Sequence, residues 1–341
     1  MKRAVLEAPG RLVVVTDERP TAGPGQVVVE VASCGICGSD LHAFNGEHPL
    51  VIYPVTPGHE FSGTIAETGE GVDPGLAGRQ VCVEPSLFCG GCLQCLSGRY
   101  NICSSLRVMG FQAPGAMCEF ISVPRDRLHF LPPGVGLVDG ALAEPAAVGV
   151  HAVSRSGIGS GDNVLIVGAG VIGLMVLKVS EALGCEAVVV ESTPERALRA
   201  VDFGAVRAVS FDRLGQGEVP SAPGDGSFAA VFECVGRPET IDLALRAAPR
   251  GGTVIVVGVP PGPVPVPVPL IQDGELEVRG TLMYRGEDFE RALELLESGA
   301  IKPDGFVTHH VSLDEVETGY RLMSDPGAKA LKVLVDIGGG A

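Results

Sequence analysis

Short apolar runs divided by turn residues dominate the first part of the chain. The clearest runs are Leu12–Val15, Val27–Val31, Gly63–Glu67 and Gln80–Val83. Turn residues such as Pro24 and Gly25 separate them. This spacing is typical of a small barrel or sandwich, so we expect residues 1–150 to form a β-rich region.

The pattern changes near residue 160, where apolar strand candidates begin to alternate with segments of helical period. The strand candidates are Val164–Val167, Ala187–Val190, Ala229–Glu233 and Thr253–Val257. The helix candidates are Leu174–Leu183, a segment that starts near Pro194, and Pro238–Ala248. Such alternation indicates parallel strands joined by crossover helices. The sequence therefore predicts an α/β fold with an open, doubly wound parallel sheet.

The last part of the chain contains three further segments. Proline and valine alternate over Pro260–Leu270. Because proline cannot donate to a strand ladder, we expect an edge or connecting segment there. Glu290–Ser298 has the pattern of an amphipathic helix, and Lys332–Asp336 has the pattern of a final strand.

Composition and charge exclude several classes of partner. The 341 residues carry a formal net charge of −16, so the chain should repel nucleic acid and anionic membranes. The start of the chain lacks the pattern of a signal peptide. The apolar run Val164–Leu177 is too short to span a bilayer, and six prolines interrupt Val254–Ile271. We expect a cytoplasmic protein without a nucleic-acid or membrane partner.

A glycine-rich turn marks a candidate dinucleotide site. The motif Gly168-Ala169-Gly170-Val171-Ile172-Gly173 follows one strand candidate and opens a helix candidate, and Glu191 lies 18 residues beyond its last glycine. This combination is a dinucleotide-binding fingerprint. We expect Gly168 to permit the turn, Gly170 to admit the pyrophosphate, and Gly173 to let the helix pack closely. Val171 and Ile172 begin that helix, whose amide groups should contact the phosphates.

Glu191 bears on the choice between NAD and NADP. A carboxylate at the end of the second strand can accept hydrogen bonds from a ribose diol and would repel a 2′-phosphate. The sequence therefore favours NAD. Arg196 lies nearby and could attract a 2′-phosphate, which leaves NADP as the less favoured alternative.

Four cysteines crowd into one short segment. They are Cys89, Cys92, Cys95 and Cys103, with Gly90, Gly91 and Gly98 between them. Four thiolates at this spacing predict a structural zinc site without an open coordination position. Disulfides, a redox-active pair and an iron–sulfur cluster are the alternatives.

A second candidate metal site lies nearer the N-terminus. Cys37 stands in the segment from Cys34 to His42, and His59 and Glu60 follow about twenty residues later. A catalytic zinc needs roughly three protein ligands and an open position. Cys37, His59 and Glu60 could supply a thiolate, an imidazole and a carboxylate.

Together, these motifs resemble the zinc-dependent medium-chain dehydrogenase/reductase family over essentially the whole chain. The resemblance implies that Cys37 and His59 bind a catalytic zinc, with Glu60 as a ligand or an exchanging ligand. Liver- and yeast-type alcohol dehydrogenases add a later cysteine ligand, but this chain has no cysteine between Cys118 and Cys185. Its Ala143-Glu144-Pro145 step instead looks like that of the sorbitol dehydrogenase branch, where the glutamate contacts the zinc-bound water or the metal.

The family resemblance also implies the domain organisation and the cofactors. Residues 1–150 and 286–341 would form a GroES-like zinc-binding catalytic domain, and residues 151–285 a Rossmann NAD-binding domain. Each chain would hold one catalytic and one structural zinc ion. Family members are usually dimers or tetramers, so we expect a homodimer or homotetramer.

The expected reaction is hydride transfer between a secondary alcohol and NAD. The zinc would lower the pKa of the substrate hydroxyl, and the protein would hold the reacting atoms about 3–3.5 Å apart. Ser39 and His42 resemble the family's proton relay, and Asp40 should orient His59.

A polyol, sugar or cyclitol is the favoured substrate class. An amino alcohol such as threonine and a simple alcohol are alternatives within the family. A zinc-stabilised binding protein is the non-enzymatic alternative.

Overall fold

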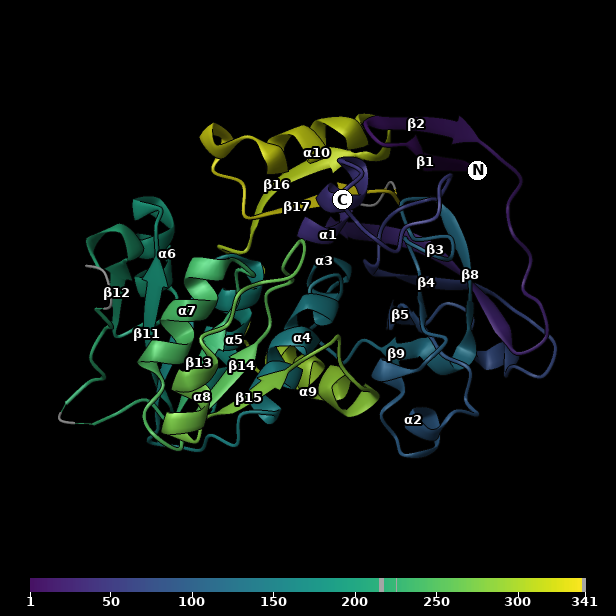
Figure 1. Cartoon of the computed structure of the whole chain (residues 1–341). Coiled ribbons are helices and arrows are strands. Elements are labelled where there is room, and N and C mark those ends of the chain that lie inside the picture. The colour runs from purple at the N-terminus through teal and green to yellow at the C-terminus, as the bar shows by residue number, and fades with distance from the viewer. Residues whose placement is uncertain (215–217, 225, 339–341) are drawn as a thin grey trace. The chain divides into compact units, whose positions relative to one another are not determined.

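The computed structural model describes residues 1–214, 218–224 and 226–338. The chain divides into two compact units, whose elements are labelled in Figure 1. Unit 1 comprises Met1–Glu144 and Arg285–Ala341, and unit 2 comprises Pro145–Tyr284.

Unit 1 is built mainly from strands. These are β1 (Lys2–Ala8), β2 (Arg11–Thr16), β3 (Gln26–Ile36), β4 (Glu60–Thr68), β5 (Gln80–Val83), β6 (Ser86–Leu87), β7 (Arg107–Val108), β8 (Phe120–Pro124), β9 (Leu128–Phe130), β16 (Val307–Ser312) and β17 (Lys332–Asp336). Its helices are α1 (Gly38–Phe44), α2 (Leu93–Leu96), α3 (Leu137–Gly140), α9 (Gly286–Glu297) and α10 (Val316–Ser324). Short 3₁₀ turns are η1 (Pro74–Leu76), η2 (Tyr100–Ile102), η3 (Arg125–Arg127), η5 (Leu313–Glu315) and η6 (Pro326–Ala328).

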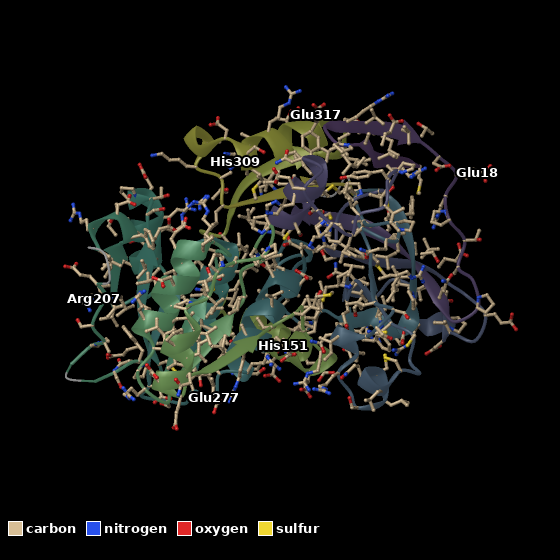
Figure 2. All side chains as sticks on the ribbon, in the orientation of Figure 1. Glu18, His151, Arg207, Glu277, His309 and Glu317 are labelled. Carbon is tan, nitrogen blue, oxygen red and sulfur yellow. The ribbon has the colours of Figure 1, made fainter. Side chains whose placement is uncertain are left out.

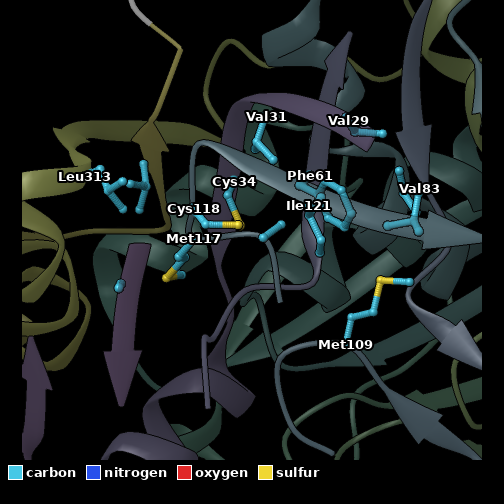
Figure 3. Close-up of a cluster of buried hydrophobic side chains, with 14 of the residues drawn as sticks. Val29, Val31, Cys34, Phe61, Val83, Met109, Met117, Cys118, Ile121 and Leu313 are labelled. Atoms are coloured by element: carbon cyan, nitrogen blue, oxygen red, sulfur yellow. The ribbon is translucent and has the colours of Figure 1, made fainter. Parts of the chain in front are cut away.

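The main sheet of unit 1 brings the two ends of its sequence together. Its order is β16-β17-β3-β4-β5-β9, and β8 also pairs with β3. Strand β17 runs antiparallel to β3, with Val333 opposite Ile36. Lys332 therefore lies beside the end of β3. Cys37 is the next residue after that strand. Apolar side chains from β3, β4, β5 and β8 fill the core beneath this sheet (Figure 3).

A buried polar network anchors the four-cysteine loop to the sheet. Glu84 is 1% exposed, and one of its oxygens lies 3.2 Å from an Arg127 guanidinium nitrogen. The Tyr100 hydroxyl, which belongs to the loop, donates to the other Glu84 oxygen at 3.1 Å. Arg127 also lies over the ring of Phe88, 4.3 Å from its centroid. Because Phe88 directly precedes Cys89, these contacts fix both ends of the loop.

Unit 2 alternates strands and helices. The strands are β10 (Asn163–Val167), β11 (Glu186–Glu191), β12 (Arg207–Ser210), β13 (Ala230–Glu233), β14 (Thr253–Val256) and β15 (Glu277–Gly280). The helices are α4 (Ala143–Ser154), which starts in unit 1, α5 (Val171–Ala182), α6 (Pro194–Asp202), α7 (Pro238–Ala247) and α8 (Val268–Gly274), with a 3₁₀ turn η4 (Phe211–Arg213).

The unit 2 sheet confirms the predicted doubly wound α/β class. Its order is β12-β11-β10-β13-β14-β15, and every pair is parallel. Leu165 and Val167 pack against α7 on one face, whereas Ile166 lies beneath Gly173 of α5 on the other. The strand order reverses between β10 and β13, and ligands of such sheets bind at the carboxyl ends of the strands at this point.

The two edge strands of this sheet carry polar side chains. Arg207 begins β12 and Glu277 begins β15, and both are exposed (Figure 2). The sequence pattern did not predict either strand, because edge strands lack the continuous apolar run of the central ones. The proline-rich segment after β14 forms no strand and leads into α8, so it is a connecting segment. Across the described ranges, none of the helices combines the length and apolarity needed to cross a bilayer.

Candidate metal and cofactor sites

The glycine motif forms the turn between β10 and α5. Gly168 has a φ of +102°, a conformation that favours glycine. A Cβ on Gly173 would lie 2.0 Å from the Gly168 carbonyl oxygen, so only glycine permits this approach of helix and strand. Gly170 caps the helix, and a Cβ there would meet nothing within 4 Å. The half-buried Val171 and Ile172 form the first helical turn. The turn therefore exposes helix-end amides to a phosphate.

Glu191 is held at the neighbouring carboxyl end of β11. One of its oxygens accepts a hydrogen bond from the Ala169 amide at 2.9 Å. The other accepts from the amides of Ser192 and Thr193 at 2.8 and 3.0 Å. These bonds fix an anionic group beside the glycine turn. Arg196 lies on α6, close enough to Arg199 to help lower the pKa of that guanidinium, although burial is the larger cause.

The four loop cysteines converge on one point. Neighbouring sulfur atoms are 3.5 Å apart for Cys92–Cys95 and for Cys89–Cys103, and 3.9 Å apart for Cys89–Cys95 and Cys92–Cys103. A zinc–sulfur bond of about 2.3 Å in a tetrahedron separates the sulfurs by about 3.8 Å. The cage therefore matches a single zinc ion. The sulfurs are too far apart for disulfides, and the ten cysteines are free thiols.

Backbone amides around the loop stabilise thiolates. Amide hydrogen bonds from Cys95 and Ser104 lower the pKa of Cys92 to about 5. Those from Gly91 and Cys92 lower the pKa of Cys89. Burial and hydrogen bonds with Cys92 and Cys103 raise the pKa of Cys95 to about 12. Metal ligation requires the thiolate form, so the loop amides favour that form at Cys89 and Cys92, whereas a bound cation would have to displace the proton of Cys95.

A second group of candidate metal ligands lies where β3 ends and β4 begins. Cys37 follows β3 and caps α1, while His59 directly precedes β4 and Glu60 begins it. Cys37, His59 and Glu60 each offer a ligand atom, and these atoms all lie within 4.8 Å of one another. His59 and Glu60 are buried and Cys37 is half-buried. The donor set of thiolate, imidazole and carboxylate fits a catalytic zinc.

Asp40 lies next to the imidazole ring of His59. It is fully buried, one of its oxygens lies 3.5 Å from His59 Nδ1, and the other accepts a hydrogen bond from the Cys37 amide at 2.9 Å. Burial would lower the pKa of His59, but Asp40 and the Cys37 thiolate outweigh burial and raise that pKa well above its ordinary value. The cluster therefore favours positive charge at this position, which a metal ion would supply.

Lys332 is a residue of this site that the sequence analysis missed. Its Nζ lies 2.8 and 2.6 Å from the two Glu60 oxygens, and both side chains are 1% exposed. Burial would lower the pKa of Lys332, but attraction to Glu60 and Cys37 raises it. A lysine at the head of an apolar strand is the only signal in the sequence, and it does not reveal a partner 272 positions away.

The remaining predicted site residues lie around this cluster. Glu144 is buried in the first turn of α4 and acts electrostatically on Lys332, but it is outside the group of ligand atoms formed by the other three residues. Ser39 is half-buried on α1. The exposed His42 lies in the last turn of the same helix, with Nδ1 3.1 Å from a Glu47 carboxylate oxygen.

Comparison with known proteins identifies the family. The alcohol dehydrogenase GroES-like domain matches residues 23–133, and the zinc-binding dehydrogenase domain matches residues 171–298. Together, the two domains cover more than half of the chain.

Relatives match along nearly the whole length. A 2-dehydro-3-deoxy-L-galactonate 5-dehydrogenase of Pseudoalteromonas atlantica is 34% identical, with 92% of each chain covered. A sorbitol dehydrogenase of Bacillus subtilis is 31% identical over 98% of this chain and 97% of its own. A solved structure of a zinc-binding dehydrogenase from Sinorhizobium meliloti bound to NADP is 34% identical, with a TM-score of 0.91 over 98% of both chains. The chain therefore belongs to the zinc-binding alcohol dehydrogenase family, within its polyol dehydrogenase branch.

Proposed function

We propose that this enzyme oxidises a secondary hydroxyl group of a polyol or sugar acid with NAD. The convergence of Cys37, His59 and Glu60, with Asp40 behind the imidazole, is the observation that carries this proposal. The sorbitol and galactonate dehydrogenases among the relatives support the substrate class.

The donor sets fit two zinc ions per chain. The cysteine loop would hold one in a closed, structural site. Cys37 and His59 would hold the other, with Glu60 and Glu144 as candidate carboxylate ligands. When bound there, zinc supplies Lewis-acid polarisation of the substrate hydroxyl. An Asp40 oxygen lies 3.5 Å from His59 Nδ1, and this position would favour Nε2 as the nitrogen that binds the metal.

Two polar residues of α1 are proposed to carry the hydroxyl proton to solvent. The Ser39 hydroxyl can accept and pass on a proton, and His42 can receive it. The contact between His42 Nδ1 and Glu47 favours a proton on Nδ1, which leaves Nε2 as the base.

The cofactor is proposed to be NAD, which accepts the hydride. Glu191 is positioned to accept hydrogen bonds from a ribose diol, and its charge opposes a 2′-phosphate. NADP remains a second candidate, because a relative binds it and Arg196 could pair with the phosphate.

A homodimer is proposed to form through β15. This strand lies at an edge of the unit 2 sheet, and exposed edges are templates for pairing with another chain. Val278 on β15 is 42% exposed and Leu282 after it is 48% exposed. Pairing of two such edges would join two copies into a homodimer, and a homotetramer would need a further interface.

Metal analysis should find about two zinc ions per chain. Cys95→Ser should retain about one, because three thiolates no longer close the loop cage. Plasma emission spectrometry on dialysed protein measures both values. About one zinc in the unmodified protein would contradict the assignment of two sites.

Cys37→Ser should lower kcat/KM roughly 10³-fold, about 4 kcal/mol, because the substrate hydroxyl loses its polarising ion. NAD binding, followed by fluorescence, should change by less than about threefold. NADH absorbance with a panel of polyols, sugar acids and amino alcohols measures turnover. The substrate proposal fails if amino alcohols alone are oxidised, and the role of Cys37 fails if the variant keeps its turnover.

Glu191→Gln should reduce the preference for NAD over NADP at least about tenfold, because it removes the charge that opposes the 2′-phosphate. The ratio of kcat/KM values for the two cofactors measures this preference. Glu186→Gln, at the exposed start of the same strand, is the matched control. An unchanged ratio in Glu191→Gln would rule out this discriminating role.

Val278→Lys should convert the protein to a monomer, because a charge on the edge strand opposes its pairing. Sedimentation velocity measures the assembly. Val206→Lys adds the same charge just before the opposite edge strand and should leave the dimer intact. A dimer that persists in Val278→Lys would place the interface elsewhere.

A further inference from the structure

Tyr100 links the four-cysteine loop to the first turn of α9. Its hydroxyl donates to a Glu84 oxygen at 3.1 Å and accepts a hydrogen bond from the Gly286 amide. Burial and the charge of Glu84 raise the pKa of Tyr100, so the hydroxyl keeps the proton that it donates. A phenol oxygen can donate one hydrogen bond and accept another, so this single atom serves both partners.

The first turn of α9 packs closely against Tyr100 and against His129 of β9. A Cβ on Gly286 would lie 3.3 Å from the Tyr100 oxygen and 3.9 Å from a carbon atom of the His129 ring. The His129 ring also stacks on Phe289 of α9, with ring centroids 4.5 Å apart, and Phe289 is fully buried. The start of α9 is therefore held by a hydrogen bond and by a ring contact.

The position of Tyr100 depends on closure of the four-cysteine loop. Its ring stacks on that of Phe88, with centroids 4.3 Å apart. Phe88 directly precedes Cys89, and Tyr100 stands three residues before Cys103. The sulfur atoms of Cys89 and Cys103 are 3.5 Å apart. A zinc ion bound by all four thiolates would hold these two ends of the loop together, and the stacked rings with them.

Gly286 lies just after the point where the chain returns from unit 2 to unit 1. Unit 2 ends at Tyr284, and the second part of unit 1 begins at Arg285. Met283, directly before this return crossing, has a φ of +50°, a left-handed conformation that non-glycine residues rarely adopt. Such a conformation persists only where the surrounding structure holds it. The contact with Tyr100 fixes the chain immediately after the crossing.

We propose that Tyr100 is a positioning residue that couples metal binding in the four-cysteine loop to the order of the return crossing. A filled loop holds the Tyr100 hydroxyl against the Gly286 amide, and loss of the metal releases that amide and the first turn of α9. Unit 1 carries the candidate metal ligands and unit 2 the glycine motif, so the loop metal acts on a segment of chain that connects them. This inference rests on the loop zinc proposed above, and it is independent of the substrate and of the zinc at Cys37.

Hydrogen exchange resolved to single amides tests this coupling. The Gly286 amide should exchange slowly in the unmodified protein. Cys95→Ser, which should lack the loop zinc, and Tyr100→Phe, which lacks the acceptor, should each speed its exchange about tenfold or more. The double variant should be no more than about threefold faster than either single variant, because both changes break the same link. Effects that multiply in the double variant would show two independent roles and would overturn the proposal.

Two controls separate this role from general destabilisation. The Gly69 amide of unit 1 donates to the Gln26 carbonyl oxygen at 2.8 Å, and its exchange should stay within about threefold in every variant. Tyr53→Phe removes a different phenol hydrogen bond of unit 1, to the Ala43 carbonyl oxygen, and should leave the exchange of Gly286 unchanged. If the Gly69 amide speeds up as much as that of Gly286, the variants have weakened the whole unit, and the proposal is overturned.

If Cys95→Ser fails to fold, chelation of the unmodified protein and readdition of Zn²⁺ decide, with the zinc content measured at each step. Zn²⁺ should slow the exchange of Gly286 about tenfold in the unmodified protein and less than about threefold in Tyr100→Phe. Equal slowing in both proteins would overturn the role of Tyr100.

The zinc content separates this proposal from the earlier ones. A loop that binds no zinc would overturn both the assignment of two sites and the coupling. An unchanged exchange rate of Gly286 after measured loss of the loop zinc would overturn the coupling alone. No substrate is added, so failure to oxidise polyols would refute the proposed function without changing these exchange rates.

Discussion

Burial of negative charge is the constraint on which the metal site of unit 1 depends. Asp40 and Glu60 are almost fully removed from solvent, and His59 is 6% exposed. Buried charges are costly unless they are compensated. Lys332 compensates Glu60, and the Cys37 amide hydrogen-bonds Asp40. A divalent ion at the ligand group would add positive charge beside Cys37 and Asp40. Metal binding should therefore stabilise this part of the fold.

Glycine residues provide the space that both the candidate metal site and the candidate cofactor site need. Gly35 leaves room for the Glu60 carboxylate in unit 1. Gly173 lets α5 approach the Gly168 carbonyl in unit 2, which brings the helix end to the turn. Glu191 then caps the Ala169 amide of the same turn. In each unit, a glycine allows two segments to approach closely and so positions a carboxylate. The charge of Glu60 would act on the expected metal ion, and the charge of Glu191 on the expected cofactor.

The features that could be predicted from the sequence are local ones. The glycine motif and the four-cysteine loop have fixed spacings within short segments, so the sequence alone indicates which ligands they could bind. The doubly wound sheet followed from its buried central strands. Membership of a dehydrogenase family also excludes the zinc-stabilised binding protein considered from the sequence.

The features that escaped prediction depend on long-range packing or on exposed edges. Lys332 meets Glu60 only because β17 pairs with β3, and no local pattern encodes that pairing. The polar strands β12 and β15 lack an apolar run because each lies at a sheet edge. The position of Glu144 beside the ligand group, and not within it, depends equally on tertiary packing.

X-ray absorption at the zinc edge tests the central claim of two different metal sites most directly. A closed site with four thiolates and a second site with the single thiolate of Cys37 predict about 2.5 sulfur ligands per zinc, with nitrogen and oxygen as the remainder. A value near four would mean that only the cysteine loop binds zinc, and it would contradict a metal site at Cys37 and His59.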